Sequence, residues 1–229
     1  MHDFLQIQAL PIVLPLGAYW IGTLCQKKWK SPILNPILIG MAIVVVFLVS
    51  TGMETAVYQA GTDKLSWLMT PATVALAIPM YEKLQILKKN GLAVAVGAAA
   101  GGVSCLAILF AAGLLLKLEP VILVSLLPKS VTAAIGVPLT QINGGIGAVT
   151  TAAIAITGIT ANMMGVTFCK WFHITDPIAQ GVAFGTAGHV IGTSKATEVS
   201  PLVGAVSSLS LVVAGLLTAL IFPVLVGIL

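Results

Sequence analysis

Residues 120–170 read PVILVSLLPKSVTAAIGVPLTQINGGIGAVTTAAIAITGITANMMGVTFCK. After Lys129 about 40 residues follow without a charged side chain. One helical crossing of a bilayer needs only about 20 apolar residues, so the chain must turn inside this stretch. Pro138 and the Gln, Asn and Gly residues after it are the natural position for a break. We therefore predict an interrupted span over 120–138 and a second span over 145–169.

The composition excludes a water-soluble globule. Of the 229 residues, 58% are hydrophobic and only 8% are charged, and the mean hydropathy is +1.08. This leaves too little polar surface to cover a soluble fold. We expect an all-α polytopic membrane protein with one transmembrane domain over 1–229 and roughly seven or eight segments, some of them interrupted.

Apolar runs outside the central stretch supply the other predicted segments. They are 4–24, 33–52, 65–80, 91–116, 177–193 and 201–228. The first is followed by lysines and lacks a small-residue cleavage site, so we interpret it as a retained span. The polar segment 53–64 is either an external loop or an interfacial helix, and 177–193 either crosses the membrane or only dips into it.

Charge distribution predicts the orientation of the chain. All eleven basic residues are lysines, and six lie in two short loops, at 27–30 and 83–89. Such clustering follows the positive-inside rule, so both loops should face the cytoplasm and the N-terminus should lie outside. A nucleic-acid partner would need a basic face interleaved with aromatic residues, which the sequence lacks.

Two segments resemble each other at a spacing of 59 residues. Leu68, Thr73, Ala75 and Pro79 match Leu127, Thr132, Ala134 and Pro138. The similarity reflects either chance between apolar segments or a repeat with halves of about 33–116 and 120–229. Transporters are often built from such halves, and paired interrupted segments then indicate the substrate site.

Lys129 is the most informative residue because it lies within an apolar run. An ammonium at membrane depth costs several kcal/mol unless it faces a cavity or a partner. Either it reaches the interface from a helix end, or it is the cation for an anionic substrate, with Ser130 and Thr132 as hydroxyl donors. A break near Pro128 would add the positive potential of a half-helix N-terminus, which suits a carboxylate.

A second candidate cluster, GTAGHVIGTSKATE, covers 185–198. Its candidate binding residues are Gly188, His189, Gly192 and Thr193. Either His189 is a hydrogen-bonded packing residue, or its titration near neutral pH allows proton-coupled transport. Glu198 is either a second coupling group or the surface partner of a lysine three residues earlier.

Proline and glycine mark the remaining candidate breaks. Thr73, between Pro71 and Pro79, forms the counterpart cluster in the first half, and a proline frees a backbone carbonyl that must find another partner in lipid. A kinked helix explains the prolines equally well. The complete set of candidate helix-breaking residues is Pro71, Pro79, Pro128, Pro138, Gly144 and Gly145.

Catalytic and metal-binding patterns are missing from the sequence. It contains no HExxH, Walker A, GxSxG or CxxC motif. The three cysteines are scattered, which argues against a disulfide framework or a metal cluster. We therefore expect neither an enzyme nor a cofactor.

Three motifs together resemble the LrgB/CidB family. They are TPATVALAIPMYEKL (70–84), LPKSVTAAIGVPLTQINGGIGAVT (127–150) and DPIAQGVAFGTAGHVIGTSKATE (176–198). The resemblance covers almost the whole chain in the same order and spacing. One departure is Gly188, which stands where a serine often precedes the family's histidine.

The resemblance implies two alternative functions in a bacterial inner membrane. One is a transporter of small organic anions, such as the monocarboxylate pyruvate or the 2-hydroxy acids glycolate and glycerate, since the plastid glycolate/glycerate translocator has a similar domain. The other is a holin- or antiholin-like oligomeric pore or scaffold that regulates murein hydrolase activity. Either implies a homo-oligomer and a small LrgA/CidA-type membrane partner. The two matched interrupted segments favour the carrier.

Overall fold

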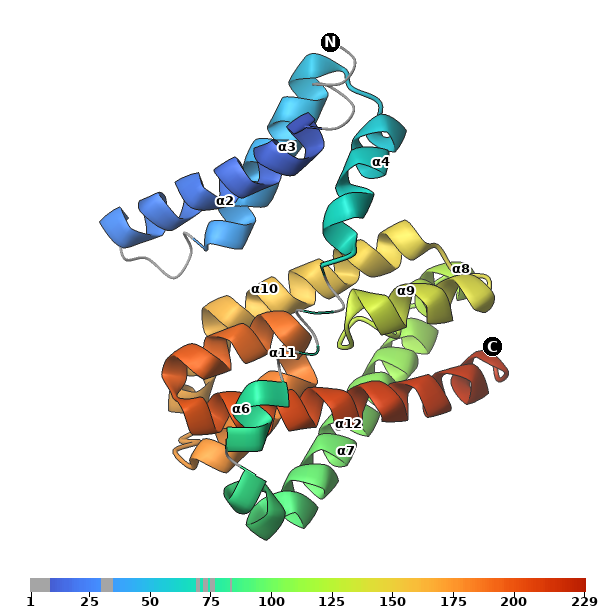
Figure 1. The fold of residues 1–229 in the computed structure, drawn as a ribbon. Helices are drawn as coiled ribbons and strands as arrows, with labels where there is room; N and C mark the ends of the chain where they lie inside the picture. The colour runs from blue at the N-terminus through green and yellow to red at the C-terminus, as the bar shows by residue number, and fades with distance from the viewer. Residues whose placement is uncertain (1–8, 30–34, 69–70, 72–73, 75–76, 83) are drawn as a thin grey trace. The chain divides into compact units, whose positions relative to one another are not determined.

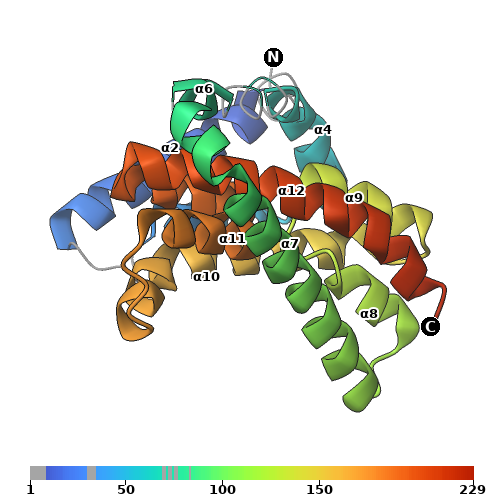
Figure 2. The ribbon, with the colours of Figure 1, turned by 90° about the horizontal axis from the view of Figure 1, so that it is seen from below.

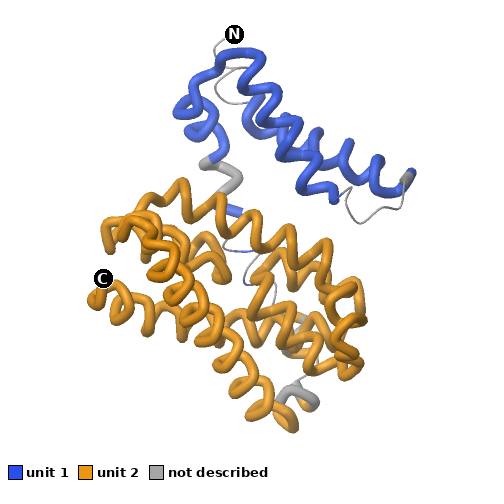
Figure 3. The backbone as a smooth tube through the Cα atoms, turned by 180° about the vertical axis from the view of Figure 1, so that it is seen from behind, with its two compact units in different colours: residues 1–75 blue, residues 76–229 orange. Residues whose placement is uncertain are grey.

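The computed structural model describes residues 9–29, 35–68, 71, 74, 77–82 and 84–229. These residues form helices and the turns between them, without a β-strand among them, so the predicted all-helical class is confirmed. Two compact units divide the chain, residues 1–75 and 76–229 (Figure 3). The predicted repeat halves stay a prediction.

The first unit contains α2 (Leu10–Trp29), α3 (Pro36–Thr51) and α4 (Thr55–Ser66). Helices α2 and α3 form a close hairpin, because a Cβ atom added to Gly22 would lie 2.6 Å from the carbonyl oxygen of Pro36. The side chain of Asn35 caps α3 by accepting a hydrogen bond from the amide of Ile37 at 2.8 Å. Glycine at position 52, with φ of 63°, ends the helix.

The second unit contains seven described helices, coloured from green to red in Figure 1. They are α6 (Ala77–Glu82), α7 (Leu84–Leu115), α8 (Pro120–Leu126), α9 (Ala133–Ile142), α10 (Gly147–Trp171), α11 (Pro177–Val199) and α12 (Pro201–Val226). Among the described residues, three stretches are long and apolar enough to cross a bilayer: Lys88–Leu115, Gly147–Trp171 and Pro201–Val226. The chain is therefore a polytopic membrane protein.

The central stretch is interrupted near Pro128 and again after α9, within the predicted regions, but Pro138 does not break a helix. Helix α8 ends at Leu126 and α9 begins at Ala133, so the break covers 127–132. Pro138 lies inside α9 and does not end it. Leu127 still has helical dihedral angles, with φ of −50° and ψ of −45°, and the helix stops at Pro128, which has no N–H to continue the hydrogen-bond ladder. The chain then turns after α9 through Gly144, whose φ of +80° favours glycine.

Two other segments also differ from the expected spans. The predicted helix over 65–80 is interrupted, because α4 continues only to Ser66 and two turn residues follow. The polar segment before it is helical in α4, in agreement with the interfacial-helix alternative. Helix α11 contains a sharp kink at His189, with φ of 42° and ψ of −137°. The segment predicted over 177–193 is thus two half-helices.

Helix α12 is the packing centre of the second unit. Its N-terminal half contacts both halves of α11 through glycines: a Cβ atom on Gly185 would collide with the carbonyl oxygen of Ser207, and one on Gly204 would lie 2.5 Å from Thr197 Oγ1. Helix α7 crosses α12 obliquely (Figure 2), with Gly102 facing Ala214. In lipid such small residues allow the close helix contact that stabilises a bundle.

Close packing at Gly185 predicts a stability difference between two equivalent substitutions. Gly185→Ala places a methyl group against the α12 backbone and should lower stability by about 1–3 kcal/mol. Gly91→Ala in α7 has no atom within 4 Å of the new methyl group and should raise stability by up to about 1 kcal/mol through helix propensity. Thermal unfolding of both variants in one detergent tests this. A Gly185→Ala protein as stable as Gly91→Ala would contradict the packing.

Candidate functional site

The second unit contains an open pocket of about 670 Å³, which we call the cavity. Four elements supply its walls: α7, the break at 127–132, α10 and the first half of α11. Pockets of roughly 300–1,000 Å³ commonly hold small ligands. The polar atoms at its surface come chiefly from Ser104, Cys105, Lys129, Ser130, Thr157, Thr160 and Thr186. We take this cavity as the candidate binding site.

Lys129 extends into the cavity from the interruption between α8 and α9. Its Nζ donates to Ser130 Oγ at 3.4 Å and lies 3.7 Å from Cys105 Sγ. Ser130 Oγ and Cys105 Sγ are 3.0 Å apart, which completes a compact group. No acidic side chain in the described part of the chain forms an ion pair with Lys129. Lys129 is half-buried, and its cation has no compensating acidic charge among these residues, which is costly between membrane helices.

Hydrogen bonds hold the interruption in place around Lys129. The amide of Lys129 donates to the carbonyl of Leu126 at 3.1 Å, and the amide of Val131 donates to the carbonyl of Pro128 at 3.2 Å. Pro128 itself is fully buried. Two amides of the break are thus paired within the protein, as a non-helical segment between membrane helices requires.

A group of hydrogen-bonded hydroxyl groups holds the turn between α9 and α10 against α8. Thr150 Oγ1 lies 2.8 Å from the carbonyl oxygen of Ser125 and 2.9 Å from Thr140 Oγ1. Ser125 Oγ accepts a hydrogen bond from the amide of Ile146 at 2.8 Å. A Cβ atom on Gly145 would lie 2.5 Å from Thr140 Cγ2, so only glycine fits there. Gly145 is a packing residue of this turn and, like Gly144, does not line the cavity.

His189 lies behind the cavity wall, at the kink of α11. It is 3% exposed, and its Nε2 is 2.9 Å from the carbonyl oxygen of Ile154 on α10. Because a carbonyl oxygen only accepts, Nε2 must carry the proton of this bond. The ring lies against Gly158, where a Cβ atom would come within 2.5 Å of it. Backbone strain at a kink of this kind costs about 1–3 kcal/mol, so the surrounding packing holds the kink.

The other predicted residues of this cluster pack within the protein. Thr193 Oγ1 donates to the carbonyl of His189 at 2.8 Å and lies 2.8 Å from Ser207 Oγ on α12. Gly188 faces Ala161 of α10, and Gly192 faces the carbonyl of Phe184 across the kink. All three predicted binding residues therefore hold the kink together, and none lines the cavity.

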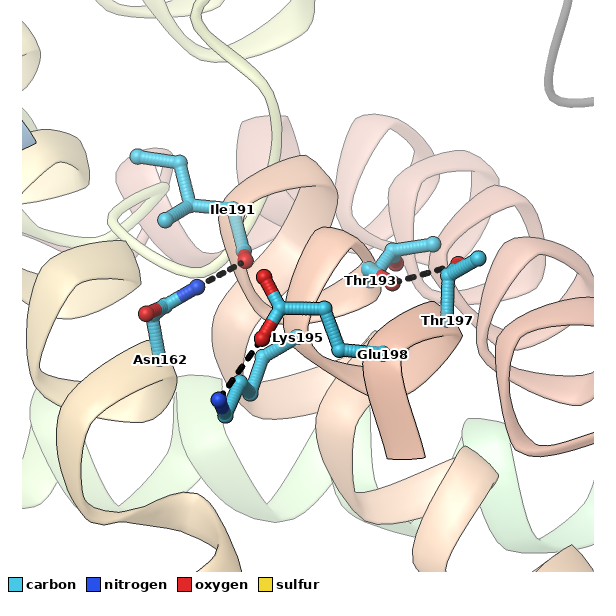
Figure 4. Close-up of polar contacts among 6 residues, drawn as sticks. All are labelled: Asn162, Ile191, Thr193, Lys195, Thr197 and Glu198. Carbon is cyan, nitrogen blue, oxygen red and sulfur yellow. Dashed lines mark hydrogen bonds and ion pairs between the residues drawn. The ribbon is translucent and has the colours of Figure 1, made fainter. Parts of the chain in front are cut away.

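The second half of α11 forms polar contacts with α10 and within its own helix (Figure 4). Asn162 of α10 donates to the carbonyl of Ile191 at 3.1 Å. Glu198, with a side chain 62% exposed, pairs with Lys195 at 2.7 Å. Glu198 is therefore the surface partner of the lysine three residues earlier, and it does not line the cavity.

The remaining predicted site residues lie away from the cavity or outside the described residues. Thr132 is the N-cap residue of α9 without a side-chain capping bond, and it does not line the cavity. Thr73 lies outside the described residues. Pro71 is exposed, and Pro79 lies within α6. Of the candidate clusters, the structure brings Lys129 and Ser130 to one cavity with Thr186 and Ala187, just before Gly188, and the place of Thr73 stays a prediction.

Several lining residues escaped the sequence analysis. Cys105 looked like a packing residue of a Gly/Ala-rich span, yet its sulfur contacts the Lys129 group. Thr157 and Thr160 are three residues apart in α10, a helical spacing that places both on one face and could have indicated a polar wall. Metal-binding chemistry finds no support, since the described residues contain no group of three His, Cys, Asp or Glu side chains that could hold an ion.

Strain at the α11 kink predicts an unusual order of stability. His189→Gly and His189→Ala both lose the imidazole and its hydrogen bond. In a regular helix alanine would be the better residue by about 1 kcal/mol, but the φ of 42° penalises any residue with a Cβ atom. His189→Gly should therefore be the more stable variant by about 1–2 kcal/mol. Thermal unfolding of the two proteins measures this, and the helical order, alanine above glycine, would contradict the kink.

Comparisons with known proteins give the family of the chain. The model of the LrgB-like family matches residues 15–228. The "Antiholin-like protein LrgB" of Bacillus subtilis (strain 168) is 33% identical over 94% of this chain and 94% of its own length. The protein of that name from Bacillus cereus (strain B4264) is 32% identical over 93% of both chains. No solved structure matches. The chain therefore belongs to the LrgB-like family of membrane proteins.

Proposed function

We propose that this protein is a carrier for small organic anions with one carboxylate, such as pyruvate, glycolate or glycerate. The observation that supports it is the Lys129 ammonium, which faces the 670 Å³ cavity and forms no ion pair with an acid of the described residues. An unpaired cation between membrane helices is costly. A bound carboxylate would supply the missing charge and regain part of that cost.

Hydroxyl groups around the ammonium suit the other oxygens of such a solute. Ser130 lies beside Lys129, and Ser104, Thr157 and Thr160 line the cavity from α7 and α10. A hydroxyl both donates and accepts, so these side chains can pair with a keto oxygen or with a hydroxyl of the solute. In this proposal they replace Thr132 and Thr193, which pack elsewhere.

The kink in α11 provides a point about which the cavity wall can move. Thr186 and Ala187 line the cavity directly before the kink. Both halves of α11 pack on α12, the first at Gly185 and the second through Thr193. Rotation of the first half-helix about His189 would expose the cavity to alternate sides of the membrane. His189 is also the candidate for proton coupling. A second proton, taken up at Nδ1, would give a positive charge to the ring whose Nε2 pairs with Ile154.

A second candidate function rests on the names of the relatives. They are called antiholin-like, which favours an oligomeric pore or scaffold that changes membrane permeability and thereby regulates murein hydrolases. That role would place the protein in a bacterial inner membrane beside an LrgA/CidA-type partner. The two functions differ in kinetics: a carrier gives saturable flux that a second solute can compete with, and a pore gives leakage proportional to concentration.

Removing the charge of Lys129 tests the carrier. In proteoliposomes, Lys129→Met keeps most of the side-chain volume but removes the cation, and uptake of labelled pyruvate and glycolate should fall at least about tenfold, the equivalent of 1.4 kcal/mol of lost interaction. Lys129→Arg should keep more activity than Lys129→Met because it preserves the charge.

The control is Lys195→Met, which removes the lysine of the surface pair and should change uptake less than about twofold, because exposed ion pairs contribute little. Equal uptake by wild type and Lys129→Met would contradict the anion site. Non-saturable leakage of uncharged solutes of similar size would favour the pore instead.

A further inference from the structure

We infer that the cavity selects monocarboxylates with a branched apolar chain, of the size of 4-methyl-2-oxopentanoate, over pyruvate and glycolate. The inference rests on the proposed carrier function and names the substrate class of the same site. Two independent features of the cavity lead to it: the number of charges in its wall, and the distribution of apolar side chains around the single cation.

Charge in the cavity wall matches a single carboxylate. Lys129 is the one charged residue among the side chains that line it, and no Asp or Glu of the described residues contributes to the wall. A dicarboxylate would therefore place its second negative charge among apolar groups, at a cost of several kcal/mol in a low dielectric. The geometry points to a monoanion.

Apolar side chains, several of them exposed at the open side, form much of the rest of the wall. Ile156 and Phe168 come from α10, Ile108 from α7 and Phe184 from α11. Phe184 is almost completely buried and packs against Gly165, where a Cβ atom would collide with its ring. Its position is thus fixed by close contact with the neighbouring helix. A solute held by its carboxylate at Lys129 would direct its remaining atoms toward these side chains.

The size of the cavity favours a solute larger than three carbons. One water takes up about 30 Å³ of liquid, so 670 Å³ corresponds to roughly twenty waters. Pyruvate would leave most of this space, and most of the apolar wall, in contact with water. Each methylene that replaces such water should improve binding roughly fourfold. A branched chain of three more carbons than pyruvate should therefore bind up to roughly 50-fold more tightly.

Ala187 is the residue through which this preference can be changed. It lines the cavity from α11 and is itself exposed, so a larger side chain there fits without displacing the protein core. Ala187→Leu would fill part of the apolar space. Ala179 lies on the same helix, is also exposed and does not line the cavity. Ala179→Leu is therefore a matched control.

The test is isothermal titration of the full chain in lipid nanodiscs, with empty nanodiscs as the baseline. The ligands are pyruvate, 2-oxobutanoate, 2-oxopentanoate and 4-methyl-2-oxopentanoate, with the dicarboxylate 2-oxoglutarate as the charge control. We expect Kd to fall roughly fourfold with each added carbon and 2-oxoglutarate to bind more weakly than 2-oxopentanoate. Ala187→Leu should reduce the ratio of pyruvate Kd to 4-methyl-2-oxopentanoate Kd at least fourfold, and Ala179→Leu should leave it unchanged.

Three outcomes would overturn the inference: a Kd independent of chain length, a ratio equal in Ala187→Leu and Ala179→Leu, or tighter binding of 2-oxoglutarate than of 2-oxopentanoate. Binding of no member of the series would overturn it as well. Uptake of the same acids into proteoliposomes separates this from the proposed function. If uptake is saturable and depends on Lys129 but Kd is the same for all acids of the series, only the inference is contradicted. If Kd depends on chain length but uptake is not saturable, the carrier is contradicted.

Discussion

Pairing of the backbone groups released where helices stop inside the membrane is the constraint on which this structure depends. Lipid offers no hydrogen bonds, so an interruption persists only where protein or an enclosed aqueous space satisfies the free N–H and C=O groups. At 127–132 the turn amides bond to carbonyls of the same turn. At the α11 kink, Thr193 pairs with the carbonyl of His189, and His189 pairs with Ile154. Each break is therefore held in one conformation.

Residues at or next to the two breaks line the same cavity. The break at 127–132 presents Lys129 and Ser130 to the cavity. The first half of α11, before the kink at His189, presents Thr186 and Ala187. Small residues on α11 and α12 allow both halves of α11 to pack closely on α12, and the cavity lies beside α7 and α10. The result is a cavity wall that combines one cation, several hydroxyl groups and apolar side chains, a combination suited to an amphipathic anion.

Much of the fold could be predicted from the sequence, and the site only in part. Hydropathy gives the long helices because a crossing requires a run of apolar residues, and Lys129 stands out because charge at depth is costly. The exact break could not be placed, since Pro128 and Pro138 are equally able to interrupt a helix and only tertiary packing decides between them. Gly188, Gly192 and Thr193 looked like a binding cluster because packing glycines and ligand-binding glycines have the same local signature. No clear sequence signal marks three lining residues, Cys105, Thr157 and Thr160. Each lies within an apolar run, and they come together only when the helices pack.

The central claim is that the Lys129 ammonium binds the carboxylate of a solute inside the membrane. Solid-state NMR measures this directly: protein with ¹⁵N-labelled lysine side chains in lipid, mixed with pyruvate labelled with ¹³C at its carboxylate, reports the distance between the two nuclei. The account predicts a close contact, of about 4 Å or less as in an ion pair, that disappears in Lys129→Met and persists in Lys195→Met. A contact that persists in Lys129→Met, or no contact in wild type at saturating pyruvate, would contradict it.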